Sequence, residues 1–331
     1  MKKKRVLVCG ASGFLGYNIF RLLATRGDLD VHGTYLTNRY GRLDPYQLAD
    51  AHLFHASNLT REERVRNLIK NYGPWDIIVQ MAANTSGAKD VENNPAVHIT
   101  DNIAMNNWIF RAAHDYHVPQ VIFPSCTVMY PNSEVPLKET DLDLNEAFYP
   151  KYFGGAWMKI YCEKLCEFYS RLGRTKYTVI RHSNIYGPHD RFDPERSHVF
   201  GATVRKISET EDGGKIIVWG HGREVRDFLY VSDFIHFVRK LIDQQDDNFD
   251  IFNLGSEESV SIKELVERMV RISGKKLEIV YDPHGPTMGT KISISAKKAR
   301  DRFAWMPQIN LDTGIRMTLS WHNENIKNKE R

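Results

Sequence analysis

A short apolar strand followed at once by three glycines constrains the fold of this chain more than any other feature. Residues 6–16 read V-L-V-C-G-A-S-G-F-L-G, with glycines at positions 10, 13 and 16, and an amphipathic segment opens at Tyr17. In such a unit the first glycine permits a tight turn, the second lets the backbone approach a pyrophosphate, and the third lets helix and strand pack closely. The pyrophosphate lies at the helix N-terminus, where unpaired N–H groups favour negative charge. We therefore expect a dinucleotide-binding unit at the start of the chain.

The first half of the chain alternates apolar strand candidates with amphipathic helical segments. The strand candidates are 5–9, 31–35, 53–55, 77–81, 121–123 and 177–181, and the helical segments are 17–25, 61–71, 97–116 and 156–171. This alternation predicts an α/β fold with a Rossmann-type, doubly wound parallel sheet.

Beyond Arg181 the pattern changes to longer loops and shorter elements, which predicts a smaller mixed α/β C-terminal domain. A helix over 261–273 is expected to start at Ser261, because Glu264 follows at capping-box spacing. We expect residues 1–184 with 226–255 to form the dinucleotide-binding domain, and residues 185–225 with 256–331 to form the second domain.

The composition argues against several classes of partner. A net charge of +4 over 331 residues is small, so nothing predicts a nucleic-acid ligand. No apolar run approaches the roughly 20 residues that a membrane-spanning helix needs, so no membrane is expected. The four cysteines contain no CxxC pair, which is typical of a reduced, cytoplasmic protein. The pairs His52/His55 and His114/His117 lack carboxylate or thiolate companions at ligand spacing, so we expect no metal.

Motifs spread in order along the chain resemble the extended short-chain dehydrogenase/reductase family of nucleotide-sugar epimerases, dehydratases and reductases. They are the glycine turn, Met81-Ala82-Ala83, Ser125-Cys126-Thr127, the helix around Lys159, and the stretches 181–188, 226–233 and 253–255. The segments 187–190 and 197–199 are most similar to the GDP-fucose synthase branch of that family. The resemblance implies an NAD(P)-dependent epimerase/reductase that makes an activated deoxysugar for surface polysaccharide, with a nucleotide sugar as substrate.

The resemblance also implies a proton shuttle, commonly a tyrosine four residues before a lysine on one helix face. Lys159 matches the lysine, but Gly155 stands where the tyrosine is expected. Cys126 stands at the usual Ser/Thr position, and Val128 stands near the position of the cysteine that acts in epimerisation. His198 matches the second epimerisation residue. The resulting catalytic candidates are Lys159, His198, Thr127, Cys126 and Tyr152.

The glycine at position 155 leaves two interpretations open. In the first interpretation, Tyr152 supplies a replacement acid, Thr127 or Cys126 gives a second hydrogen bond, and the site keeps its chemistry. Alternatively, ordinary alcohol–ketone chemistry is lost. The site then performs dehydration or epimerisation with other groups, or the protein is a catalytically silent binder that regulates a partner enzyme.

Contacts to cofactor, substrate and a second subunit follow from the same resemblance. The stretch from Val31 to Leu43 holds no acid but contains Arg39 and Arg42, which suits a 2′-phosphate and favours NADP over NAD. Helices 97–116 and 156–171 resemble the family's dimer-forming pair, so a homodimer is expected. The implied cofactor contacts are Gly10, Ser12, Gly13, Phe14, Leu15, Gly16, Arg39, Asn58, Leu59, Ala82, Ala83 and Lys159. The implied substrate contacts are Asn184, Arg205 and Arg226.

Overall fold

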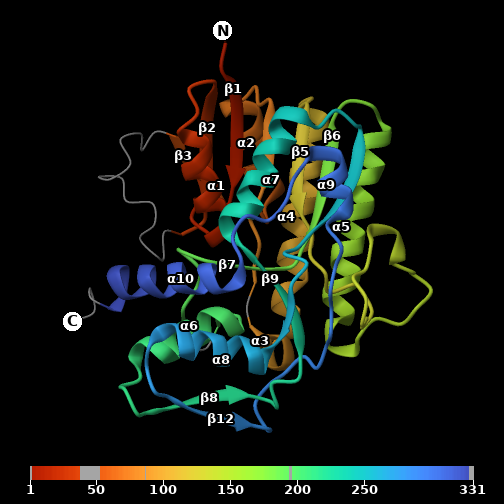
Figure 1. The fold of residues 1–331 in the computed structure, drawn as a ribbon. Helices are drawn as coiled ribbons and strands as arrows, with labels where there is room; N and C mark the ends of the chain where they lie inside the picture. Colours follow the sequence, from red (N-terminus) through yellow and green to blue (C-terminus); the bar gives the residue numbers. More distant parts are fainter. Residues whose placement is uncertain (1, 38–52, 86, 194–195, 328–331) are drawn as a thin grey trace.

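Strand β1 (Lys4–Cys9) lies inside a parallel sheet and packs its side chains alternately against both faces (Figure 1). Val6 and Val8 belong to one hydrophobic core, and Leu7 and Cys9 belong to the other. This division follows from the two-residue period of a strand. The structure is a computed structural model, and it describes residues 2–37, 53–85, 87–193 and 196–327.

Within the described residues the main sheet has seven strands, all paired in parallel. The strands that join β1 are β2 (Leu29–Tyr35), β3 (Phe54–Ala56), β4 (Ile77–Gln80), β5 (Gln120–Pro124), β6 (Lys176–His182) and β10 (Phe249–Leu254). Their order is β10-β6-β5-β4-β1-β2-β3. This is a doubly wound arrangement: the chain adds β2 and β3 on one side of β1, and β4 then starts the other side. The predicted fold class and its six strands are confirmed, and β10 is a seventh strand that the prediction lacked.

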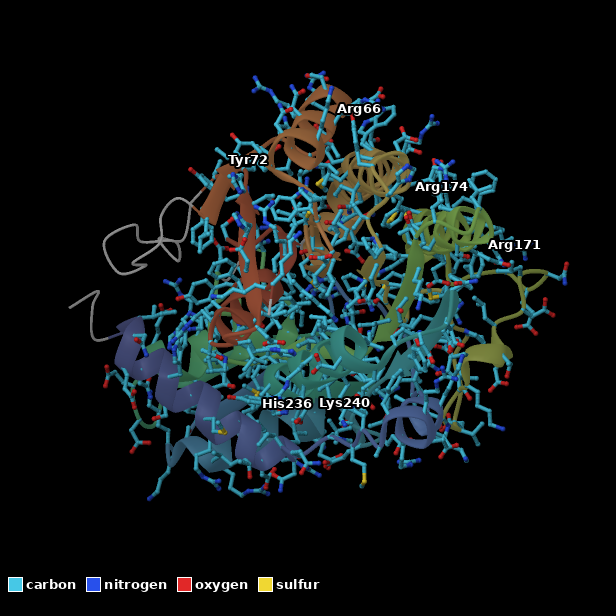
Figure 2. All side chains as sticks on the ribbon, turned by 90° about the horizontal axis from the view of Figure 1, so that it is seen from above. Arg66, Tyr72, Arg171, Arg174, His236 and Lys240 are labelled. Atoms are coloured by element: carbon cyan, nitrogen blue, oxygen red, sulfur yellow. The ribbon has the colours of Figure 1, made fainter. Side chains whose placement is uncertain are left out.

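Helices cover both faces of this sheet (Figures 1 and 2). One face carries α1 (Phe14–Ala24) and α7 (Val231–Gln244), and the other carries α2 (Glu62–Tyr72), α4 (Thr100–Asp115) and α5 (Phe153–Arg171). Figure 2 shows the two sides directly: Arg66 and Tyr72 of α2 lie opposite His236 and Lys240 of α7.

The predicted helix over 97–116 is wrong at its start. The chain first forms α3 (Ala88–Asn93) and the 3₁₀ turn η2 (Pro95–His98), and α4 begins only at Thr100. The side-chain amide of Asn102 donates to the carbonyl oxygens of His98 (2.7 Å) and Asn84 (2.9 Å). These bonds hold the segment before α4 in a turn, because the Asn102 amide serves backbone groups outside the helix.

Two smaller sheets follow in the second half of the chain. The strands β7 (Asn184–Tyr186), β9 (Val225–Tyr230) and β11 (Ser259–Ser261) form one, and β8 (Lys215–Trp219) pairs with β12 (Glu278–Asp282) in the other. They are accompanied by α6 (Val199–Glu209), α8 (Ile262–Ser273), α9 (Lys297–Phe303) and α10 (Leu311–Asn325). Figure 1 shows α6, α8, β8 and β12 below the main sheet. The residue boundaries of the two domains stay a prediction.

The start of α8 agrees with the predicted cap. The Ser261 hydroxyl accepts a hydrogen bond from the Glu264 amide at 3.1 Å. The helix ends at Gly274, whose φ of 73° is the left-handed conformation that glycine adopts without a steric penalty. The predicted helix over 261–273 is therefore confirmed at both ends.

Candidate active site

The candidate residues gather at one edge of the main sheet. Because β1, β4, β5 and β6 are parallel and paired in register, their carboxyl ends meet at the same edge. Gly10 follows β1 there, Ala82 follows β4, Ser125 follows β5 and Ser183 follows β6. In open parallel sheets this edge, near the point where the strand order reverses, is where ligands bind.

The glycine turn after β1 has a geometry that only glycine tolerates. Gly10 has a φ of 74°, and a Cβ atom there would lie 2.7 Å from the Ala82 Cα. A Cβ at Gly16 would lie 2.2 Å from the Gly10 carbonyl oxygen. The turn is fastened to β2, since the Ala11 amide donates to the Thr34 carbonyl (2.7 Å) and the Gly10 amide to the Thr34 hydroxyl (2.9 Å).

The N-terminus of α1 is suited to an anion. Gly13 occupies the N-cap, contributes no capping side chain, and no acidic residue lies in the first turn. The amides of Phe14, Leu15 and Gly16 precede the first possible intrahelical hydrogen bond, and Tyr17 is the first to donate, to the Gly13 carbonyl at 2.9 Å. The close approach at Gly10 and the uncapped amides together fit the pyrophosphate of a dinucleotide.

The remaining predicted cofactor contacts lie along the same edge. Asn58 accepts from the amide (3.0 Å) and hydroxyl (2.7 Å) of Thr60, and Leu59 beside it is buried. The Ala82 amide donates to Gln80 Oε1 at 3.2 Å, which holds the backbone of Ala82 and Ala83 at the end of β4. Ser12 lies in the turn itself. Arg39 and Arg42 fall outside the described residues.

Lys159 joins α5 to the end of β5. Its ammonium donates to the Pro124 carbonyl at 3.1 Å and lies 5.0 Å from the centre of the Phe123 ring. One helical turn earlier, a Cβ at Gly155 would have no neighbouring atom within 4 Å. Position 155 therefore offers space for a side chain and supplies no hydroxyl.

The structure brings Cys126 into the electrostatic range of both Lys159 and Tyr152. Burial raises the pKa of the Cys126 thiol, against the positive charge of Lys159, so this residue is a thiol at neutral pH. Tyr152 ends the 3₁₀ turn η4 (Pro150–Tyr152), and burial raises the pKa of its hydroxyl against the influence of Arg226. Thr127 is half-buried beside Cys126.

His198 lies at the N-cap of α6 and keeps contact with solvent. Exclusion of water by the surrounding protein is the largest influence that lowers the pKa of its imidazole. The positive charge of Arg191 and the nearby His98 lower this pKa further. His198 is therefore neutral at neutral pH. His98, in the turn before α4, was not singled out from the sequence.

The three predicted substrate contacts each have a protein partner. Asn184 donates to the Asp227 carbonyl at 3.0 Å, and Arg205 pairs with Glu209 at 2.6 Å. Arg226 is 8% exposed and donates to the carbonyl of Thr290 (2.5 Å), to the carbonyl of Val225 (3.0 Å) and to Glu224 (3.1 Å). Their contact with substrate stays a prediction.

A buried ion pair that was not predicted from the sequence lies one helical turn after Lys159. Glu163, one turn after Lys159 on α5, accepts from Arg181 of β6 at 2.7 Å, and both side chains are at most 5% exposed. Arg181 also donates to the Tyr130 hydroxyl at 2.9 Å and to the Glu139 carbonyl at 3.1 Å. The pair fixes α5 against the strand that ends at the site. A charged residue inside a strand of apolar residues was the available signal.

We expect Glu163→Gln to lower the free energy of unfolding by about 2 kcal/mol, because charge-assisted hydrogen bonds to the buried guanidinium are lost. Glu167→Gln is the matched control one turn later. Glu167 pairs with Lys164 and Arg171 at the surface, so its effect should stay within about 0.5 kcal/mol. Urea unfolding measures both, and equal effects would contradict the assigned role of the buried pair.

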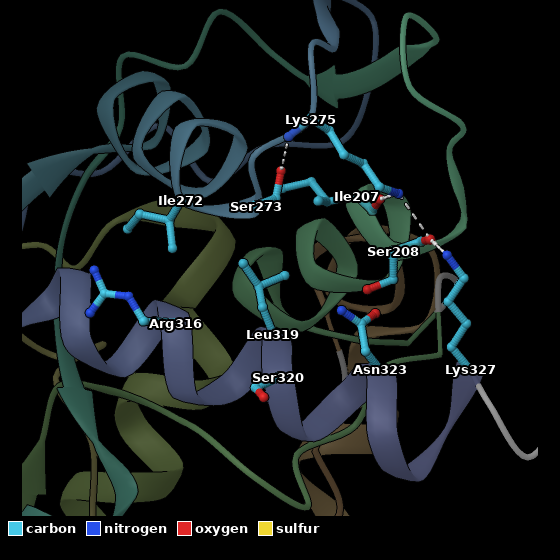
Figure 3. A pocket seen from close by; sticks show the side chains of 10 residues that line it. All are labelled: Ile207, Ser208, Ile272, Ser273, Lys275, Arg316, Leu319, Ser320, Asn323 and Lys327. Atoms are coloured by element: carbon cyan, nitrogen blue, oxygen red, sulfur yellow. Dashed lines mark hydrogen bonds between the residues drawn. The ribbon is translucent and has the colours of Figure 1, made fainter.

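A pocket of about 390 Å³ between α6, α8 and α10 lies apart from the site, and none of the candidate residues lines it (Figure 3). Two of the cations that line it serve the fold. Lys275 donates to the Ile207 carbonyl at 2.6 Å, and Lys327 donates to the Ser208 carbonyl. These bonds satisfy carbonyl groups at the C-terminus of α6, where positive charge is favourable.

The described residues were also compared with the requirements of a metal centre and of a membrane-spanning helix. Among them, no group of three or more His, Cys, Asp or Glu side chains could hold a metal ion. No described helix combines the length and apolar character needed to cross a membrane.

The parallel sheet, the glycine turn and the lysine on α5 define a dinucleotide-binding α/β protein of the Rossmann type. Residues 6–255 match the model of the NAD dependent epimerase/dehydratase family. The chain belongs to this family, as the sequence motifs indicated.

Several related proteins are similar to this chain over nearly its whole length. The chain is 29% identical to the GDP-L-fucose synthase of Escherichia coli (strain K12), with 98% of each chain covered. It is 30% identical to the GDP-L-fucose synthase of Sinorhizobium fredii, covering 94% of this chain and 93% of the relative. Identity to the GDP-mannose 3,5-epimerase 1 of Oryza sativa subsp. indica is 26%, over 99% of this chain and 84% of the relative.

Solved structures share the fold. The UDP-glucose 4-epimerase of Thermotoga maritima superimposes with a TM-score of 0.84 at 24% identity, covering 97% of this chain and 99% of that one. The UDP-glucose 4-epimerase of Thermus thermophilus, solved with NAD, gives a TM-score of 0.81 at 22% identity, covering 97% and 100%. At this identity the likeness concerns architecture alone.

Proposed function

We propose that this protein is an NAD(P)-dependent nucleotide-sugar epimerase/reductase that acts on a GDP-linked keto-deoxysugar. The observation that carries the proposal is Lys159, held at the end of β5 by its bond to the Pro124 carbonyl, at the same sheet edge as the glycine turn that fits a dinucleotide. A bound nicotinamide dinucleotide supplies hydride exchange with a sugar carbon. The full-length similarity to GDP-L-fucose synthases supports the choice of guanine as the base of the nucleotide.

The cofactor, the cellular setting and the oligomeric state complete the proposal. NADP is favoured over NAD, because the sequence after β2 offers arginines and no acid for the ribose. The product is an activated deoxysugar for surface polysaccharide, made in the cytoplasm, which the four free cysteines support. A homodimer through α4 and α5 is supported by aromatic residues exposed along α5: Phe153, Trp157, Tyr161 and Phe168.

A second function is favoured by one observation, the glycine at position 155. A protein that binds dinucleotide and nucleotide sugar without turnover would regulate a partner enzyme, and it would need no hydroxyl at that position. The neutral imidazole of His198 and the thiol of Cys126 at the same edge argue for retained chemistry.

Turnover decides between the two functions. We expect the protein to convert a GDP-linked 4-keto-6-deoxy sugar in the presence of NADPH, followed by nicotinamide absorbance and by product NMR. NMR is needed because an epimerisation leaves the absorbance unchanged. CDP-, UDP- and dTDP-linked 4-keto sugars are the comparison substrates. Tight binding of a nucleotide sugar with no turnover of any of them would establish the silent binder.

A further inference from the structure

A chain of buried polar side chains connects the end of β4 to α5. Gln80, the last residue of β4, donates through Nε2 to the Oδ1 atom of Asn106 on α4 at 2.8 Å. Asn106 Nδ2 donates in turn to the sulfur of Cys162 on α5 at 3.5 Å. All three residues are at most 3% exposed. Buried polar groups are costly unless they are hydrogen-bonded, and a satisfied network fixes one arrangement of the elements that it joins.

The backbone of Ala82 determines how the two amides of this chain are oriented. The Ala82 amide donates to Gln80 Oε1 at 3.2 Å, and the Ala82 carbonyl accepts from Gln80 Nε2 at 3.1 Å. A backbone N–H only donates and a carbonyl only accepts, so Oε1 and Nε2 cannot exchange places. The second proton of Nε2 then requires an oxygen of Asn106, which turns the Asn106 nitrogen toward Cys162. The chain therefore has one hydrogen-bonded arrangement.

One end of the chain reaches the glycine turn. Ala82 lies directly against Gly10, since a Cβ at Gly10 would be 2.7 Å from the Ala82 Cα and 2.9 Å from the Ala82 nitrogen. The peptide that Gln80 holds is thus packed against the turn that fits the pyrophosphate. A shift of this peptide would move the turn, because no space separates the two.

The other end of the chain reaches the helix that carries Lys159. Cys162 follows Lys159 by three residues, so the two side chains lie on the same face of α5. The Lys159 ammonium is bonded to the Pro124 carbonyl at the sheet edge, and Cys162 belongs to the core between the sheet and α4. Burial raises the pKa of the Cys162 thiol to about 11, so the group is neutral and its sulfur accepts from Asn106.

We propose that Gln80 and Asn106 are positioning residues that hold the glycine turn and Lys159 at a fixed separation, so that one dinucleotide contacts both. This rests on the proposed function, in which the turn binds the pyrophosphate and Lys159 binds the nicotinamide half of the cofactor. The two contacts belong to a single molecule, so an error in their separation weakens one of them and displaces the reacting ring.

Asn106→Leu tests this role directly, because leucine neither accepts from Gln80 nor donates to Cys162 and leaves the bonds between Gln80 and Ala82 in place. We expect the Kd for NADPH to rise by about tenfold, the effect of losing one charge-assisted hydrogen bond. The kcat should fall by about 10²-fold. The Kd for adenosine 2′,5′-bisphosphate, which lacks the nicotinamide half, should stay within about twofold.

This pair of affinities separates positioning from a merely structural role. A variant that only lost stability would bind both ligands normally while folded and would lose both on unfolding. Asn107→Leu is the matched control, since Asn107 is the half-buried neighbour of Asn106 on α4 and takes no part in the chain. It should change neither affinity. Isothermal titration measures all four dissociation constants.

A second pair of variants keeps the test open if Asn106→Leu does not fold. Cys162→Ala removes the acceptor of Asn106, whereas Cys166→Ala removes an equally buried thiol one turn later that lies outside the chain. We expect Cys162→Ala to weaken NADPH binding several-fold and Cys166→Ala to leave it unchanged. Equal NADPH affinities in the two variants would contradict the proposed positioning.

The outcomes distinguish this inference from the proposed function. If the protein turns over its substrate, and Asn106→Leu and Cys162→Ala bind NADPH as tightly as the unmodified protein, the inference is wrong and the proposed function stands. If NADPH binds but no substrate is turned over, the proposed activity is wrong, and the two affinities decide alone. A protein that binds no dinucleotide overturns both.

Discussion

A Gly13→Val protein is expected to lose dinucleotide binding while it keeps its fold. Gly13 has extended backbone angles that valine adopts, and a Cβ there would lie 3.2 Å from the Gly10 carbonyl, a contact that a small shift relieves. The branched side chain would, however, stand in front of the uncapped amides of Phe14 and Leu15. Two lost hydrogen bonds to a charged pyrophosphate, at about 1.5–3 kcal/mol each, weaken binding by about 10²–10⁴-fold.

Isothermal titration with NADPH and NADH measures this loss. Gly27→Ala is the control, because a Cβ at Gly27 has no atom within 4 Å and the residue lies outside the turn. Thermal unfolding should show both variants folded. Unchanged NADPH affinity in a folded Gly13→Val protein would remove the basis for the cofactor assignment. Gly16→Val is unsuitable for this test, since its Cβ would overlap the Gly10 carbonyl at 2.2 Å.

The second large effect is a gain of activity. Gly155→Tyr should raise kcat by about 10²-fold or more, because a phenol four residues before Lys159 lies on the same helix face and can exchange the proton. The open space around position 155 admits the ring without displacing a neighbour at Cβ. The Lys159 ammonium would lower the pKa of the added phenol.

Gly155→Phe is the matched control, since it adds the ring without the hydroxyl. It should leave kcat at the level of the unmodified protein. Product NMR and nicotinamide absorbance together report turnover. Equal rates for the tyrosine and phenylalanine variants would show that position 155 does not face the reacting oxygen, and the assignment of Lys159 as its neighbour would then fail.

Local patterns in the sequence were sufficient for the main sheet and for the cofactor turn. The continuous apolar run Val6, Leu7 and Val8 predicted a strand, and both of its faces are buried because successive side chains of any strand point to opposite sides. The glycine spacing predicted the turn, because backbone crowding at Gly10 and Gly16 excludes every other residue. The strand period and the crowding of Gly16 against Gly10 involve neighbours in the sequence, so they are readable without the fold, whereas the contact of Gly10 with Ala82 is not.

The partners of the site residues depended on strand register and on helix packing. The pairing of Pro124 with Ile180 sets the end of β5, where Lys159 donates to the Pro124 carbonyl, beside the end of β6. The start of α4 and the Glu163–Arg181 pair could likewise not be predicted from local patterns. The Asn102–Asn84 bond before α4 and the ion pair each join residues 18 positions apart. The sequence by itself determined the sheet, the glycine turn and the lack of a side chain at position 155. The tertiary structure decided which groups stand near that position, because long-range contacts follow from packing and not from local periodicity.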